Sequence, residues 1–289
     1  MRTEQQMLDL ILYTARDDNR IRAVIMNGSR ANPNAPQDIF QDFDIVYVVT
    51  DVDSFKNDPH WIDRFGERMI LQLPDEMEDP PPEPGDSYAY LIQLVDGNRI
   101  DLSLFPVGKI QEMGRDSQSI LLLDKDGIIE AFPPPSDQDY LPQPPTAKQF
   151  FDCCNEFWWV SPYVAKGLWR KEITYAKTLM DQAVRDQLMK ILTWYLGVKT
   201  GFSKSLGKFG KYFDQYLEPE LWSLLLKTYS DANYGNTWDA LETMGELFRR
   251  TAIPVAAHFG FEYPYGDDER VSAHLRHVRH LPKDAKEMY

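Results

Sequence analysis

The chain has 289 residues, of which 43% are apolar, 26% charged and 13% aromatic, so it can bury a sizeable core, has room for two domains and is neither disordered nor collagen-like. Lys and Arg number 31 against 45 Asp and Glu, which gives a net charge of −14. Because that excess repels phosphate backbones and anionic lipid and attracts cationic small molecules, we expect no nucleic-acid and no membrane partner.

The two cysteines, Cys153 and Cys154, are adjacent. This spacing suits neither a disulfide framework nor the C-x-x-C pairs of zinc and redox sites. The sequence begins with charged and polar residues, and no run approaches the roughly 18 apolar residues of a membrane helix. We therefore expect a cytoplasmic protein, and nothing in the sequence demands more than a monomer.

Helix caps and apolar periodicity predict the first elements. Thr3 opens a capping-box pattern ahead of apolar residues at helical spacing, so the chain is expected to begin with a helix that ends at 17–19. A short β-rich run follows at 21–26, then a turn at 27–29 and a polar loop at 31–41.

Residues 43–49 carry the strongest strand signal, and their nearly continuous apolar character predicts a central strand covered on both faces, although Asp44 lies within it. The other elements expected in this half are a helix near 61–65, a strand at 68–73, an extended proline-rich loop at 80–84, and a hairpin with strands at 88–95 and 99–105. The hairpin surrounds Asp96-Gly97, a preferred pair for a type I′ turn. The first half is therefore predicted to be α/β.

Six prolines between residues 132 and 145 predict a stiff linker, with one domain at 1–135 and another at 136–289. No strand pattern follows the linker. An apolar stripe of helical period runs through 186–196, and the same period recurs at 221–229 and 238–248. The second half is predicted to be a helical bundle.

Three aspartates of the first half are placed to meet. Asp42 and Asp44 begin the 43–49 strand and Asp101 lies within a later one. Side chains two residues apart on a strand point to the same face, so Asp42 and Asp44 share one. Converging carboxylates repel one another unless divalent cations neutralise them, and hard oxygen ligands suit Mg²⁺ bound to a substrate phosphate. The pattern predicts a two-metal site for phosphoryl or nucleotidyl transfer.

The turn Gly28-Ser29-Arg30, at the end of the first predicted strand, fits the same site. A glycine turn exposes backbone N–H groups to a phosphate oxygen, the serine hydroxyl can add a donor, and Arg30 would supply positive charge nearby. The plainer interpretation is that Gly-Ser is only a turn and that Asp42 and Asp44 begin a solvated strand. Asp101, on a strand whose alternate residues are apolar, favours the metal site.

These residues resemble the polymerase-β type of nucleotidyltransferase. Beyond that short motif, the chain resembles the aminoglycoside 6-adenylyltransferases, also called streptomycin adenylyltransferases, over essentially its whole length. The matching segments are NGSRAN at 27–32, QDFDI at 41–45, RIDL at 99–102, EFWW at 156–159 and HVRHLP at 277–282. The resemblance implies an α+β fold, with an N-terminal mixed-sheet nucleotidyltransferase domain followed by a C-terminal helical bundle.

The same resemblance implies a reaction: transfer of AMP from Mg-ATP to the 6-hydroxyl of streptomycin, which releases pyrophosphate and confers antibiotic resistance. Asp42 and Asp44 match the pair that binds two Mg²⁺ ions, and Gly28 and Ser29 match the phosphate-binding turn. Asp101 matches the third carboxylate, which serves as a ligand of the second metal, as the base that deprotonates the attacking hydroxyl, or as both.

A lysine-rich segment of the second half is a candidate for ATP binding. Lys204, Lys208 and Lys211 cluster with Lys199 among glycines, where they could reach the β and γ phosphates across an interdomain cleft. The alternative is a solvated basic loop. The segment is not a Walker A loop, because its glycine spacing is wrong, Lys208 is followed by Phe rather than Ser or Thr, and no strand precedes it.

An aromatic cluster just past the linker is the candidate drug site. Glu156, Trp158 and Trp159 put a carboxylate beside aromatic faces, which suits a guanidinium group of a cationic aminoglycoside. Aromatic residues at this density are more often core, so core packing is the alternative for both tryptophans.

Two other functions remain open from the sequence. The same chemistry could act on another acceptor, such as another aminocyclitol, a lincosamide or a protein hydroxyl. A non-catalytic regulator could instead sense Mg-ATP through the acidic cluster without turnover. An interrupted carboxylate set would favour the regulator, and here all three carboxylates are present.

Overall fold

The computed structural model describes residues 1–77 and 87–289, so the predicted loop at 80–84 lies outside the described residues. The chain divides into two compact units, Met1–Asp139 and Tyr140–Tyr289, whereas the sequence prediction placed the boundary after residue 135. Each unit encloses its own apolar core. In the described ranges, every helix is too short or too polar to cross a bilayer.

The first unit is built on a six-stranded mixed sheet. Its strands are β1 (Ile21–Asn27), β2 (Phe43–Val49), β3 (Arg68–Gln72), β4 (Tyr88–Leu94), β5 (Arg99–Pro106) and β6 (Ile120–Asp124). They lie in the order β3-β4-β5-β2-β1-β6, with β2 and β5 parallel and the other neighbours antiparallel. The predicted central strand is therefore confirmed. Edge strand β6 was not predicted, because its leucine-rich run lacks the alternation that marks a half-buried strand.

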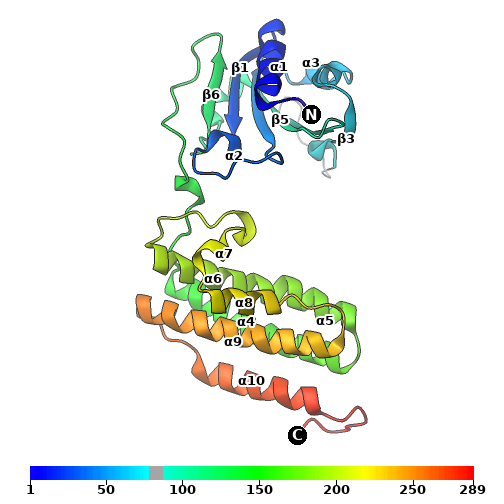
Figure 1. The fold of residues 1–289 in the computed structure, drawn as a ribbon, viewed down its shortest axis with the longest axis vertical. Coiled ribbons are helices and arrows are strands. Elements are labelled where there is room, and N and C mark those ends of the chain that lie inside the picture. Colours follow the sequence, from blue (N-terminus) through cyan, green and yellow to red (C-terminus); the bar gives the residue numbers. More distant parts are fainter. Residues whose placement is uncertain (78–86) are drawn as a thin grey trace. The chain divides into compact units, whose positions relative to one another are not determined.

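Helices cover this sheet on one side. The opening helix α1 (Glu4–Asp17) is capped as predicted: the Thr3 hydroxyl accepts from the Gln6 backbone at 3.2 Å, and the Gln6 side chain accepts from the Thr3 backbone at 2.9 Å. Its apolar face packs on the sheet (Figure 1), where the Tyr47 hydroxyl donates to the Ile11 carbonyl at 2.7 Å. The remaining short helices are α2 (Gly28–Ala31), α3 (Asp53–Lys56), and 3-10 turns at Trp61–Phe65, Pro74–Met77, Val107–Glu112 and Gln138–Tyr140.

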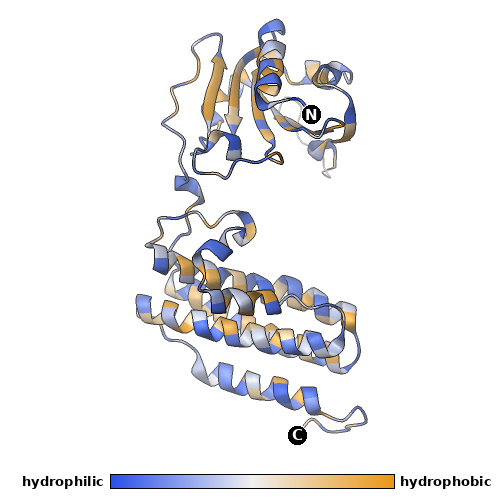
Figure 2. Ribbon diagram, in the orientation of Figure 1, coloured by the Kyte–Doolittle hydropathy of each residue, from blue (hydrophilic) through white to orange (hydrophobic). Residues whose placement is uncertain are grey.

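Alternation along β2 gives the sheet two different faces. Phe43, Ile45 and Tyr47 belong to the large core under α1, whereas Val48 packs in a smaller cluster with the 3-10 turn after β5 and with residues 128–132. Because side chains alternate along a strand, Asp44 lies on the same face as Val48. Figure 2 shows the strands as the most continuously hydrophobic part of this unit.

The predicted hairpin of β4 and β5 forms, but the type I′ turn is wrong. Gln93 pairs with Arg99, the Gly97 N–H donates to the Leu94 carbonyl at 3.0 Å, and Gly97 alone has positive φ, +91°. A type I′ turn needs positive φ at both central residues, so this is a longer turn that closes on one left-handed glycine. Asp96 instead anchors the N-terminus, because its carboxylate accepts from the Arg2 guanidinium at 2.7 Å.

The second unit is helical, as predicted, which completes an α+β fold. Its helices are α4 (Ala147–Trp169), α5 (Ile173–Leu179), α6 (Arg185–Thr200), α7 (Phe213–Tyr216), α8 (Pro219–Lys227), α9 (Tyr234–Phe259) and α10 (Tyr265–His280), with a π turn at Met180–Val184 and a 3-10 turn at Lys208–Gly210. The three predicted apolar stripes lie on α6, α8 and α9. The apolar sides of the long helices meet in one core, which includes Cys153 and Cys154.

Candidate active site

Parallel pairing of β2 and β5 brings the three predicted aspartates together. Asp44 is the register partner of Asp101 on β5 and of Asn27 on β1. Asp42 immediately precedes β2, and the two-residue spacing gives it the same face as Asp44. Three acidic side chains from two distant stretches of sequence therefore lie at one end of one sheet face.

Gly28 closes this site from the neighbouring strand end. Its φ is +73°, and a Cβ at this position would lie 2.3 Å from the Asp44 Oδ2 atom. Both the backbone conformation and the close approach thus require glycine here. Ser29 follows in the single turn α2, and within the described residues its hydroxyl has no hydrogen-bond partner. The glycine turn and the carboxylates form one continuous site.

Arg30 has a structural role that the sequence did not predict. Its guanidinium donates to the backbone carbonyls of Asp42 at 3.0 Å and Gln41 at 2.7 Å, and it stacks 3.9 Å from the centre of the Phe43 ring. The side chain is 7% exposed and also pairs with Glu4 at 3.2 Å. Arg30 therefore fixes the backbone that carries Asp42. Its predicted contact with the nucleotide stays a prediction.

Sequence reasoning did not single out Arg99 as a site residue. Its guanidinium donates two hydrogen bonds to Asp101, Nε to Oδ1 at 2.7 Å and Nη2 to Oδ2 at 2.8 Å. The Arg99 Nε atom also lies 3.7 Å from the Asp42 Oδ2 atom. The available signal was the two-residue spacing from Asp101, which puts both side chains on one face of β5.

The charges of this cluster are only partly compensated. Burial, together with the negative charges of Asp101 and Asp42, raises the pKa of Asp44 to about 6, and the positive charges of Arg99 and Arg30 oppose this rise only in part. Burial and Asp101 also raise the pKa of Asp42, against the opposing effect of Arg99. Within the described residues no donor reaches the Asp44 carboxylate. The cluster therefore favours binding of a proton or of another cation.

The donor set suits a divalent metal ion, since carboxylate oxygens are the ligands that Mg²⁺ prefers. The arrangement itself is not that of a formed metal site: across the described ranges, no group of three or more His, Cys, Asp or Glu side chains is arranged to hold a metal. Both oxygens of Asp101 are held by Arg99. The carboxylate oxygens are suitable metal ligands, but Arg99 occupies both oxygens of Asp101.

The predicted ATP lysines belong to the second unit. Lys204, Lys208 and Lys211 lie between α6 and α7, and within the described residues none of them pairs with a carboxylate. Lys199, at the end of α6, is different, because it donates to Glu218 at 2.7 Å and to the Tyr216 carbonyl at 2.9 Å. Lys204, Lys208 and Lys211 are the lysines of this segment that remain available to an anion.

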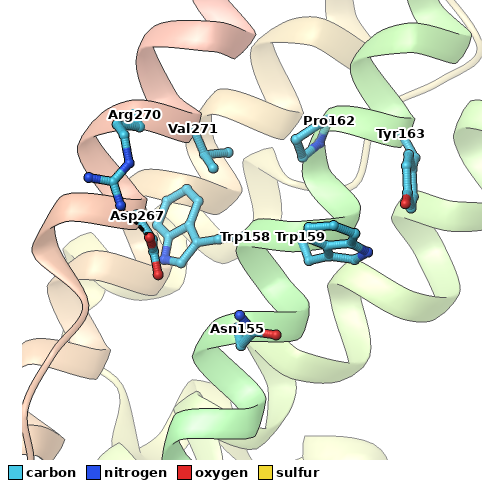
Figure 3. Close-up of a pocket in the computed structure, with 8 residues that line it drawn as sticks. All are labelled: Asn155, Trp158, Trp159, Pro162, Tyr163, Asp267, Arg270 and Val271. Atoms are coloured by element: carbon cyan, nitrogen blue, oxygen red, sulfur yellow. Dashed lines mark hydrogen bonds and ion pairs between the residues drawn. The ribbon is translucent and has the colours of Figure 1, made fainter.

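The three predicted drug-binding residues differ in their exposure and in whether they line a cavity. A cavity of about 440 Å³ lies between α4 and α10 (Figure 3). Both tryptophans line it. Trp159 is 62% exposed, whereas Trp158 is 2% exposed and packs edge-on against Phe157 and Phe248, so most of the Trp158 side chain belongs to the core. Glu156 is exposed and is not among the residues that line the cavity.

The opposite wall of this cavity comes from α10. Asp267 and Arg270 reach it as an ion pair with atoms 2.6 Å apart, and Tyr163 of α4 lies edge-on to Trp159 (Figure 3). Asp267 and Arg270 were not predicted, because sequence does not reveal which helix faces α4.

A glycine turn, two aspartates at i and i+2 where one strand begins, and a third aspartate on its parallel neighbour form the arrangement in which the chain resembles the nucleotidyltransferase class. The sequence matches the streptomycin adenylyltransferase family over residues 1–278. The chain belongs to this family and is an adenylyltransferase, which confirms the resemblance.

Individual relatives cover nearly the whole chain. It is 45% identical over 271 residues to the aminoglycoside 6-adenylyltransferase of Campylobacter jejuni, with 93% of each chain covered, and 42% identical over 270 residues to that of Bacillus subtilis (strain 168), with 93% and 95% covered. It is also similar to a crystal structure of an aminoglycoside 6-adenyltransferase from Bacillus subtilis, at 37% identity and a TM-score of 0.48, with 97% of this chain and all of that chain covered. Adenylyl transfer by this family implies ATP as co-substrate and a divalent metal.

Proposed function

We propose that this enzyme transfers AMP from Mg-ATP to the 6-hydroxyl of streptomycin and releases pyrophosphate, which inactivates the antibiotic. The observation that carries the proposal is the convergence of Asp42, Asp44 and Asp101 beside the Gly28 turn. The acceptor is supported by the name of the family and by the names of the relatives. Because the donor is ATP, we propose a cytoplasmic enzyme, and we take it to act as a monomer.

In this proposal the carboxylates prepare an in-line displacement at the α-phosphorus of ATP. Asp42 and Asp44 would hold two Mg²⁺ ions, and Asp101 would act as a third ligand, as the base, or as both. When bound, the ions supply charge stabilisation at the attacking and leaving oxygens. The 6-hydroxyl oxygen forms the new bond to the α-phosphorus, and the bond to the oxygen bridging the β-phosphate breaks. The hydroxyl proton passes to Asp101 where that residue acts as base.

The chain's own donors would position the nucleotide. The backbone N–H groups at Gly28 and Ser29 and the free Ser29 hydroxyl are suited to a phosphate oxygen. Arg30 contributes indirectly, because it holds the Asp42 backbone. We also propose that Lys204, Lys208 and Lys211 contact the triphosphate. Support for these lysines is their lack of a carboxylate partner among the described residues.

For the drug, we propose contacts from Glu156, Trp158 and Trp159, with Trp158 reaching the cavity from a largely buried position. An exposed indole face and a free carboxylate both suit a guanidinium group. The excess of acidic over basic residues also favours a cationic substrate over an anionic one.

The test is incubation of the full chain with ATP, Mg²⁺ and a panel of acceptors, with pyrophosphate release as the readout and Asp44→Asn as the inactive control. We expect release with streptomycin and an adenylylated drug by mass spectrometry. Release with a lincosamide, another aminocyclitol or a protein alone would reject streptomycin and keep the chemistry. Tight ATP binding without release on any acceptor would support the non-catalytic regulator instead.

A further inference from the structure

Arg99 lies among the carboxylates of the acidic cluster. Its guanidinium makes two parallel bonds to Asp101, at 2.7 and 2.8 Å, and reaches toward Asp42 at 3.7 Å. Three carboxylates share this face of the sheet, and Arg99 is the guanidinium that bonds directly to one of them. The bonds of Arg30 go to backbone carbonyls and to Glu4.

The Arg99–Asp101 pair is built so that it can open. The side chains are 41% and 23% exposed, and within the described residues Asp101 has no other donor. A permanent pair in this protein looks different: Asp268 is 3% exposed and accepts from Arg249, Tyr263 and Ser272 together. Releasing Arg249 would strand a buried charge, whereas Arg99 can move into water and leave a carboxylate that water or a metal can reach.

We propose that Arg99 is a positioning residue that acts as the counter-ion of the carboxylates in the metal-free enzyme, and that its guanidinium must leave Asp101 when a divalent metal binds. The inference rests on the proposed function, with Asp101 as the third metal ligand beside Asp42 and Asp44. Arg99 keeps Asp101 in its rotamer before binding and competes with the metal for the same two oxygens. Opening a two-bond charged pair lowers the metal affinity of the wild type by about 10-fold relative to a chain without it.

The experiment titrates the full chain with Mn²⁺ alone, without nucleotide, and follows free Mn²⁺ by electron paramagnetic resonance. We expect Arg99→Gln to bind Mn²⁺ about 10-fold more tightly than the wild type. Arg99→Lys keeps the charge but not the two parallel bonds, so its affinity should lie between the two. Arg68→Gln is the matched control, because Arg68 forms a comparably exposed pair with Asp63 at 2.7 Å in the same unit. Melting curves verify that each variant is folded.

A second readout follows the guanidinium itself. In ¹⁵N-labelled protein, the Nε–H signal that disappears in Arg99→Gln is the signal of Arg99. We expect it to be protected from exchange with water in the metal-free enzyme and to lose that protection at saturating Mg²⁺.

Two results would overturn the inference and leave the proposed metal site intact. One is an Arg99→Gln affinity no tighter than that of the wild type, and the other is an Nε–H signal still protected at saturating Mg²⁺. Failure of the proposed function looks different: Asp44→Asn would then bind Mn²⁺ as tightly as the wild type, and both proposals would fall.

Discussion

Asp44 and Asp268 are two aspartates withdrawn from water, one in each unit, but they differ in their hydrogen-bond partners and in the direction of their pKa shifts. Asp268 accepts from Arg249 at 2.6 Å, from Tyr263 at 2.8 Å and from Ser272 at 3.0 Å. Asp44 has no such donor among the described residues and faces two other carboxylates. Burial by itself would raise the pKa of both; at Asp268 the three donors outweigh it and lower the pKa, whereas at Asp44 the neighbouring charges add to it.

This difference distinguishes a carboxylate that stabilises the fold from one that is suited to bind a ligand. A buried charge with every acceptor satisfied stabilises one conformation and has nothing left to offer a ligand. A carboxylate that is partly buried, unpaired and close to like charges is costly for the fold, and such groups concentrate at functional sites. The comparison predicts that substitutions at the two positions will affect different measurements.

The largest effect should come from the active-site carboxylates. Asp44→Asn, like Asp42→Asn and Asp101→Asn, removes an anionic ligand and should lower turnover by at least about 10³-fold. Folding of Asp44→Asn should be unharmed, because the Asp44 carboxylate accepts no hydrogen bond from the described residues, whereas Asp101→Asn also disturbs the pair with Arg99. Pyrophosphate release and a melting curve measure the two properties, with Asp58→Asn, an exposed aspartate of the same unit, as control. Turnover at the wild-type level with Mg²⁺ present would remove that residue from the mechanism.

The second largest effect should be on stability. Asp268→Asn leaves Arg249 without its buried partner and should lower the free energy of unfolding by about 3 kcal/mol. The neighbouring Asp267→Asn breaks only a surface pair with Arg270 and should cost less than about 0.5 kcal/mol. Urea unfolding of the helical signal measures both. Equal costs for the two variants would contradict the role given to the buried network.

A smaller effect is expected at the glycine turn. Gly28→Ala adds a methyl group against the Asp44 carboxylate at a positive φ, and should cost about 1–3 kcal/mol and reduce turnover. Gly127→Ala is the matched control, because its φ is also positive, +65°, but no atom lies within 4 Å of the added group. The cost of the clash is the difference between the two variants in free energy of unfolding and in turnover. A Gly28→Ala enzyme as active as Gly127→Ala would show that the close approach does not matter.

The smallest effect is a pH dependence of stability without metal. The pKa of Asp44 is about 6 in the fold and 3.8 as its ordinary value, so the native state holds the proton more strongly. Its contribution is therefore fully present below about pH 4 and is lost as the pH rises through 6. Relative to Asp44→Asn, the wild type should lose on the order of 1 kcal/mol between these limits. The assignment would be contradicted if the stability of the wild type relative to Asp44→Asn did not change with pH, or if it fell as the pH is lowered.

Much of the candidate site was predictable because its signals are local. The spacing of Asp42 and Asp44, the glycine turn after a strand and the isolated Asp101 each follow from alternation and turn chemistry within a few residues. The Thr3 cap and the apolar stripes of α6, α8 and α9 are local in the same sense. These patterns placed the carboxylates on strands without any knowledge of which strands are neighbours.

The pairing of those strands was decided by tertiary structure. Asp101 stands beside Asp44 because β5 crosses to run parallel with β2, and no short-range pattern specifies that partner. The same holds for the bonds of Arg99 and Arg30, and for the burial of Trp158 while Trp159 lies open beside α10. Composition and periodicity determined which residues can carry charge, cap a helix or fill a core. Which of them meet depends on packing between segments far apart in the chain, since that packing sets the distances and the access to water on which their chemistry depends.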